Sequence, residues 1–354
     1  MLTLSGKLKA LLLLLVVAPI LISFVRVPFV GTVQAQEKIK IGFSIEAMNG
    51  ERWQTDLDSF QARAKELGAQ VVSADAKGDD NLQLQQVNEM IQSGIQVLVL
   101  FPHDAAKAVA IVDAAKAANV KVISYDRLVR NSDVDLYITF NRMEMGKMQA
   151  EALVQRAPKG NYVLIAGSPN SEDAKALHDA QMSVLQPYVT RGDIKIVADD
   201  YIQDWVPGDA YLAMLKALDA THGDIAAVVS SNDGMAGGVI QALREKNLAG
   251  KVAVSGQDAD LAAVICVAQG TQTMTIYKPI RQQANRAAEE AVRLAKGETP
   301  HGDFAVNNGK AKVPAILLKP VLVTRDMISS TVVKDGFQSL KSINQALSPD
   351  QQIK

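Results

Sequence analysis

The chain has 354 residues, of which 48% are hydrophobic and 21% charged, and its formal net charge is -1. This composition is typical of a globular protein with one large or two medium domains. No long basic run occurs, which excludes the electrostatic footprint of a nucleic-acid-binding protein. The single cysteine, Cys266, excludes a disulfide framework within the chain and is expected to be a small core residue.

The N-terminus has the pattern of an export signal. Lys7 and Lys9 precede an apolar run over 10–22, and Val33-Gln34-Ala35 offers small residues at the spacing that a signal peptidase reads. We therefore predict that residues 1–35 are a signal peptide and that the mature protein, with 34 basic and 38 acidic residues, is exported. An uncleaved membrane anchor is the alternative, because the region after the apolar run is long.

Strand and helix patterns alternate along the remaining chain. The expected strands are 39–44, 69–74, 97–101, 120–125, 136–140, 162–166, 194–198, 227–230 and 252–255. The expected helices are 52–67, 81–93, 105–118, 146–155, 173–189, 210–220 and 235–246. Such alternation produces right-handed βαβ units and parallel sheets covered on both faces. The pattern restarts after residue 140, which predicts an α/β protein with two Rossmann-like lobes.

Similar polar and aromatic side chains follow the predicted strands in both halves. In chain order they are Glu46, Arg52, Trp53, Asp126, Arg127, Asn141, Trp205, Asn232, Asp258 and Lys278. In open α/β sheets, ligands bind beyond the carboxyl ends of the strands. Forked Arg, Asp and Asn groups can each bind two neighbouring hydroxyls, and an indole packs flat on the C–H face of a sugar ring.

Each of these residues also has a purely structural interpretation. A single tryptophan is usually a core or rim residue, and a single Arg or Lys is usually solvated. Asp126 with Arg127, or Asn232 with Asp233, could cap the helix that follows. The sugar-site hypothesis therefore depends on the recurrence of one chemistry at equivalent places in the two halves.

At these positions the chain resembles the ribose/galactose-type periplasmic sugar-binding family of bacterial ABC transporters, in particular its D-xylose-binding branch. The resemblance runs from about residue 38 to 336. The segments that carry it are Glu51-Arg52-Trp53-Gln54, Tyr125-Asp126-Arg127, Gly160-Asn161-Tyr162, Ser231-Asn232-Asp233, Ala236-Gly237-Gly238, Ser255-Gly256-Gln257-Asp258-Ala259-Asp260-Leu261, Gly270-Thr271-Gln272-Thr273-Met274 and Tyr277-Lys278-Pro279-Ile280.

The resemblance implies a role for each matching residue. Arg52 and Arg127 would donate to sugar oxygens, and Asp126 and Asp258 would accept from hydroxyls. Asn232, Lys278 and Asn141 would complete the polar shell, and Trp53 and Trp205 would sandwich the ring. The implied ligand is a monosaccharide, most plausibly D-xylose, bound by a monomer that delivers it to an ABC permease; a chemoreceptor role could coexist.

The resemblance also implies a type I periplasmic binding protein, whose two lobes are joined by a three-segment hinge. We expect the crossings near 140–142, 275–277 and 302–306. The N-terminal lobe would then comprise 36–140 and 276–303. The C-terminal lobe would comprise 141–275 and 304–345.

One departure from the family pattern affects the expected cleft. Asn141-Arg142 stands where xylose binders tend to have Asp-Asn, and Glu46 stands where the pattern has Asp. A buried Arg142 would need an anionic partner, and our hypothesis is that Glu46 supplies it and shifts selectivity among sugars. The alternative is that Arg142 points to solvent at the lobe edge.

The sequence leaves three alternative functions. An enzyme is disfavoured because no Walker A, GxSxG or zincin motif occurs and the four histidines have no metal-ligand spacing, so we expect neither a metal nor a cofactor. A regulator of the lac-repressor type would carry a helix-turn-helix where this chain has an export signal. The same fold could also bind another pentose, a hexose or a polyol.

Overall fold

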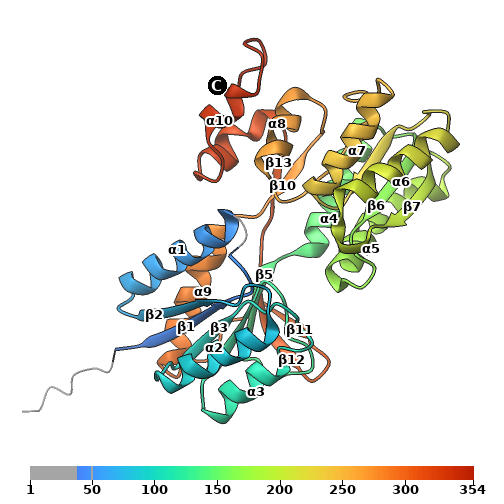
Figure 1. Ribbon diagram of the computed structural model, residues 1–354. Helices are drawn as coiled ribbons and strands as arrows, with labels where there is room; N and C mark the ends of the chain where they lie inside the picture. Colours follow the sequence, from blue (N-terminus) through green and yellow to red (C-terminus); the bar gives the residue numbers. More distant parts are fainter. Residues whose placement is uncertain (1–37, 49–50) are drawn as a thin grey trace, which may run out of the picture. The chain divides into compact units, whose positions relative to one another are not determined.

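The computed structural model describes residues 38–48 and 51–354. The predicted signal peptide therefore lies outside the described residues. None of the helices within those two ranges is long and apolar enough to cross a membrane. The described chain contains two α/β lobes and a small C-terminal subdomain (Figure 1).

The N-terminal lobe is built on a seven-stranded sheet in the order β11-β12-β5-β4-β3-β1-β2. All neighbours are parallel except β11 and β12, which form an antiparallel hairpin at one edge. The strands are β1 (Lys40–Ile45), β2 (Gln70–Asp75), β3 (Val97–Leu100), β4 (Lys121–Tyr125), β5 (Leu136–Phe140), β11 (Phe304–Asn307) and β12 (Lys312–Leu318).

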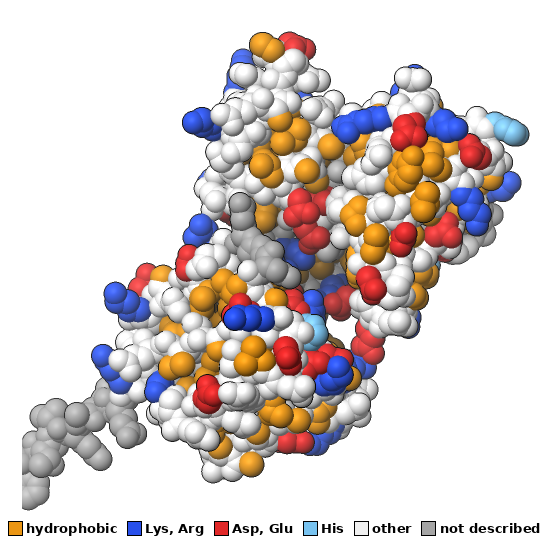
Figure 2. All heavy atoms as spheres, viewed as in Figure 1, with side chains coloured by type: hydrophobic (Ala, Val, Ile, Leu, Met, Phe, Trp, Pro, Cys, Tyr) orange, Lys and Arg blue, Asp and Glu red, His pale blue; other side chains and the backbone are white. Residues whose placement is uncertain are grey.

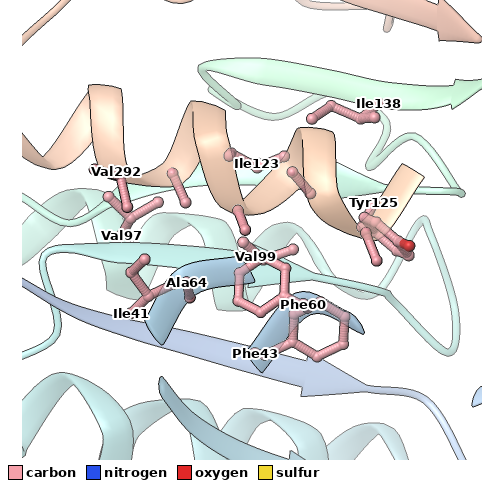
Figure 3. Close-up of a cluster of buried hydrophobic side chains, with 14 of the residues drawn as sticks. Ile41, Phe43, Phe60, Ala64, Val97, Val99, Ile123, Tyr125, Ile138 and Val292 are labelled. Atoms are coloured by element: carbon pink, nitrogen blue, oxygen red, sulfur yellow. The ribbon is translucent and has the colours of Figure 1, made fainter. Parts of the chain in front are cut away.

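Helices cover both faces of this sheet because its central strands are apolar on both sides. One face packs on α1 (Glu51–Glu66) and α9 (Ile280–Ala295), and the other packs on α2 (Asp80–Gln92) and α3 (Val109–Ala117). Figure 3 shows the first of these cores, in which Phe43 of the sheet lies beside Phe60 of α1 and Val97 lies beside Val292 of α9.

The C-terminal lobe repeats this plan on a smaller, fully parallel sheet in the order β7-β6-β8-β9. Its strands are β6 (Gly160–Ala166), β7 (Ile194–Tyr201), β8 (Ala227–Ser230) and β9 (Ala253–Val254). One face packs on α4 (Arg142–Arg156) and α5 (Glu172–Thr190), and the other packs on α6 (Pro207–Ala220) and α7 (Asp233–Glu245). The expected alternation of strands and helices is confirmed in both lobes.

The C-terminal subdomain has an apolar core of its own. It contains α8 (Leu261–Gln269), the antiparallel pair β10 (Thr275–Tyr277) and β13 (Val321–Val323), and α10 (Leu340–Gln345). Two short helical turns, Arg325–Met327 and Ser329–Val333, connect β13 to the last helix.

Three segments run between the lobes, and the third differs from the expected one. The chain crosses after β5, between β10 and α9, and between β12 and β13 (Figure 1). The resemblance predicts the third crossing near 302–306 and places 304–345 in the C-terminal lobe. That placement is wrong for 304–318, because β12 pairs in parallel with β5 and buries Val313 and Ala315 in the N-terminal core.

Candidate functional site

A cavity of about 300 Å³ lies where the two lobes face each other at their strand ends. Figure 2 shows acidic and basic side chains gathered in the hollow between the lobes. Eight of the nine predicted sugar-binding residues line the cavity: Arg52, Trp53, Asp126, Arg127, Trp205, Asn232, Asp258 and Lys278. Whether they bind a sugar stays a prediction, but the structure brings them together.

Asp126 projects from a strained turn at the end of β4. Its backbone is left-handed, with φ of 62°, and its N–H donates to the Ile138 carbonyl at 2.9 Å. Its carboxylate lies 3.0 Å from the Arg52 guanidinium. Burial by itself would raise the pKa of Asp126, but Arg52 and Lys278 outweigh burial and hold the pKa below its ordinary value. Asp126 is therefore a charged acceptor facing the cavity.

Arg52 is positioned by a buried carboxylate one helical turn along α1. Its Nε donates to Asp56 at 3.3 Å, and the Tyr125 hydroxyl donates to the other oxygen of Asp56. Burial raises the pKa of Asp56 to about 6, although Arg52 and the Tyr125 hydroxyl act in the opposite direction. The sequence gives no signal for this role beyond the i, i+4 spacing of Arg52 and Asp56.

Asp258 occupies the corresponding place after β9 in the C-terminal lobe. Its backbone φ is 107°, its N–H donates to the Ile276 carbonyl at 2.8 Å, and its carboxylate lies 2.7 Å from Lys278 Nζ. Burial would raise the pKa of Asp258, but Lys278 outweighs it and the pKa is lowered. Each lobe thus presents one ionised aspartate at a strand end.

The two tryptophans line the cavity from different lobes. Trp53 packs edge-on against Phe101, with 4.7 Å between ring centroids, and the Arg52 guanidinium lies 4.5 Å from its ring centre. Trp205 has a left-handed backbone, with φ of 60°, and its indole lies against Gly167. A Cβ on Gly167 would come within 2.2 Å of that indole, so a glycine is required there.

Glu46 and Arg142 do not contact each other, so the hypothesis that they form a pair is wrong. Glu46 pairs with Arg127, whereas Arg142 Nε lies 2.8 Å from Asp173 at the start of α5. The alternative prediction, that Arg142 points to solvent, is also wrong, since its side chain is only 16% exposed. The two side chains point in different directions. Arg142, which follows β5, points toward α5, whereas Glu46, at the end of β1, lies beside the turn after β4.

The two predicted asparagines both cap helices. Asn141 accepts from the Glu144 N–H at 3.2 Å at the start of α4, and Asn232 accepts from the Met235 N–H at 3.0 Å at the start of α7. Asn232 nevertheless lines the cavity. Asn141 instead lines an adjoining opening of the cleft. Whether Asn141 belongs to the polar shell stays a prediction.

The cavity also contains residues that the sequence did not single out. They are Thr139, Phe140, Met145, Ser171, Asp173, Leu177 and Gln257. Arg142, for which the sequence predicted another partner, lines the cavity as well. Ser171 and Asp173 follow the end of β6. Because ligands bind beyond the carboxyl ends of the strands in open α/β sheets, these two residues could have been predicted. The apolar members carry no such signal, because they are core residues that reach the cavity wall. Within residues 38–48 and 51–354, no cluster of three or more His, Cys, Asp or Glu could hold a metal ion.

Comparison with known proteins gives the family. The chain matches the periplasmic binding protein domain over residues 41–299. It belongs to the periplasmic binding protein family. Relatives of this periplasmic binding protein include the D-xylose-binding periplasmic proteins of Escherichia coli and Haemophilus influenzae. The first is 46% identical, with 85% of this chain and 91% of the relative aligned, and the second is 45% identical, with 86% and 92% aligned.

Solved structures of sugar-binding transport proteins share the fold of this periplasmic binding protein. A carbohydrate transporter solute binding protein from Chloroflexus aurantiacus, determined in complex with D-glucose, superimposes with a TM-score of 0.76 at 30% identity. The match covers 86% of this chain and 98% of that protein. The type I architecture expected from the sequence is thereby confirmed.

Proposed function

We propose that this protein captures a monosaccharide, D-xylose, in the periplasm and delivers it to the permease of an ABC importer. The observation that carries the proposal is the pairing of charges around the cavity. Arg52 pairs with Asp126, and Lys278 pairs with Asp258. Such pairs suit a neutral ligand rich in hydroxyl groups, because each charged group can hydrogen-bond a hydroxyl without losing its ionic partner.

The same pairing disfavours a charged ligand. Arg127 and Arg142 also have carboxylate partners, Glu46 and Asp173, so all four cavity cations are balanced. An amino acid or a sugar phosphate would have to displace one of these partners and leave a buried charge uncompensated. A free sugar needs no such rearrangement, and the two indoles offer apolar faces for its C–H groups.

We further propose that the protein binds its sugar without chemical conversion. Hydrolysis of a glycoside needs a carboxyl group that can act as an acid. The cavity carboxylates Asp126 and Asp258 have lowered pKa values because of their cation partners, which suits acceptors and not acids. The proposal includes export of the protein through the predicted signal peptide. It also includes a second partner, a chemoreceptor that would bind the same protein.

D-glucose is the alternative ligand, because a solved structure with the same fold contains it. The Chloroflexus aurantiacus structure was determined with D-glucose, whereas the two curated relatives at 45–46% identity are named for D-xylose. We favour the pentose because those relatives are more similar in sequence to this chain than the Chloroflexus aurantiacus protein is.

The experiment is a thermal-shift panel on protein beginning at Glu37, unfolded and refolded so that it carries no copurified sugar. A ligand that binds only the native state raises the melting temperature, and at a fixed ligand concentration the rise grows with the logarithm of its affinity. We expect the largest rise with D-xylose, smaller rises with other pentoses and D-glucose, and none with xylose 5-phosphate. A larger rise with the phosphate than with any free sugar would contradict the proposal.

A further inference from the structure

The Arg142 guanidinium, which departs from the expected family pattern, lies on the turn that presents Asp126. Arg142 is the first residue of α4, directly after the first crossing between the lobes. From there its side chain reaches back to the N-terminal lobe. Nη2 donates to the Asp126 carbonyl at 2.9 Å, and Nη1 donates to the hydroxyls of Tyr137 and Thr139 at 2.9 Å each.

These contacts form a closed network around one carbonyl oxygen. The Tyr137 and Thr139 hydroxyls, which accept from Arg142, both donate to the Asp126 carbonyl, at 3.0 and 3.1 Å. Tyr137 is 5% exposed and Thr139 only 1%. Hydrogen bonds in such a buried chain polarise one another, and an interrupted chain leaves buried polar groups unpaired.

The turn needs such support because its backbone is strained. A left-handed φ of 62° is disfavoured for an L-residue and persists only where the surroundings fix it. Arg142 also lies 2.8 Å from Asp173, so its charge is balanced from the C-terminal lobe. With three hydrogen bonds and this ion pair, most of the guanidinium is already engaged by protein groups.

We propose that Arg142 is a positioning residue of the sugar site, which fixes the Asp126 turn and so aims the Asp126 carboxylate at the ligand. This inference rests on the proposed function, since Asp126 matters as an acceptor only when a hydroxyl is bound. Arg142 thus acts through Asp126, and its contribution to affinity depends on the presence of that carboxylate.

The test is a double-mutant cycle on D-xylose affinity, measured by calorimetry with Arg142→Met, Asp126→Ala and the double variant. Each single change should weaken binding at least about tenfold. The double variant should bind within about twofold of Asp126→Ala alone, because residues that act through one another are not additive. Losses that multiply in the double variant would overturn the proposal.

Arg130→Met is the matched control. Arg130 also reaches the first turn of α5, where it lies 3.1 Å from Glu172, but its guanidinium donates to the Asn307 carbonyl at 3.3 Å and not to the Asp126 carbonyl. We expect its D-xylose affinity to stay within about twofold of the unmodified protein. An equal loss in Arg130→Met would instead assign the effect to ion pairing between the lobes and contradict a positioning role.

A measurement without ligand separates this inference from the proposed function. Hydrogen exchange of the refolded protein should show faster exchange over residues 126–129 in Arg142→Met but not in Arg130→Met. If the unmodified protein binds no sugar, the proposed function fails while this result still decides the role of Arg142. Unchanged hydrogen exchange over residues 126–129 in Arg142→Met would overturn the positioning role of Arg142. Should Arg142→Met not fold, Thr139→Val breaks the same network and serves in its place.

Discussion

At the residue scale, each of the four cavity cations has a carboxylate partner, and these ion pairs fix the direction in which the long side chains point. Parallel strands bring their carboxyl ends to one edge of a sheet, so Asp126 and Asp258 could each be placed, from their positions in the sequence, at the ligand-binding edge of the sheet in their own lobe. The direction of a long side chain is not encoded in that position. The pairing of Arg142 with Asp173, and of Glu46 with Arg127, was therefore missed.

The two tryptophans should contribute directly to affinity. Trp53→Ala or Trp205→Ala should weaken D-xylose binding by roughly 1.5–3 kcal/mol, which is the scale of a lost buried aromatic contact. Because they are the only tryptophans in the chain, fluorescence of each single variant reports on the remaining indole. Sugar should change both signals. Normal affinity in both variants would show that the indoles are only structural.

Asp56 should link folding stability to pH. Its pKa is about 6 in the folded protein against an ordinary value of 3.8, so the native state takes up a proton before the unfolded chain does. Stability from this group is therefore gained as pH falls through 6 and lost as pH rises. Relative to Asp56→Asn, the unmodified protein should gain about 1 kcal/mol of unfolding free energy between pH 7 and 5.

Chemical denaturation of both proteins at the two pH values measures this difference. The Asn variant serves as its own control, because it keeps the shape of the side chain but cannot titrate. A constant difference between the two proteins would show that Asp56 has an ordinary pKa.

At the scale of elements, the packing of α6 on α7 depends on one of two adjacent glycines in α7. The sequence alone does not indicate which of the two it is. A Cβ on Gly238 would lie 2.1 Å from the Pro207 carbonyl oxygen at the start of α6, whereas a Cβ on Gly237 would meet nothing within 4 Å. Gly238→Ala should therefore destabilise the fold by roughly 1–3 kcal/mol through overpacking.

Gly237→Ala is the matched control and should stabilise the protein by about 0.5–1 kcal/mol, because alanine is the better helix former. Denaturation midpoints of the two variants give the comparison. Equal effects in both would mean that α6 and α7 do not approach as closely as the structure shows.

The element that sequence reasoning misplaced was the edge hairpin of β11 and β12. Alternating strands and helices predict a parallel sheet, but an antiparallel hairpin that follows α9 breaks that alternation. Val313, Ala315 and Ile316 are buried in the N-terminal lobe, and this tertiary burial decides the position of β12. Such long-range pairing with β5, across more than half the chain, leaves no local signal.

At the scale of the whole molecule, family membership and the balanced charges of the cavity support one account: a two-lobed receptor for a neutral sugar. Both lobes contribute an ionised aspartate with a cation partner and an aromatic ring. A ligand held from both sides would be bound once per chain. The sequence could predict this division of the site, since each half supplies one tryptophan and one such aspartate.

The most direct test of this account is a calorimetric titration of the refolded, sugar-free protein with D-xylose. We predict a saturable heat signal with one site per chain, and a loss of affinity of roughly 2–5 kcal/mol in Asp126→Ala and in Asp258→Ala with the fold intact. A protein that is folded and sugar-free, and that gives no heat with D-xylose or with any other pentose or hexose, would contradict the account.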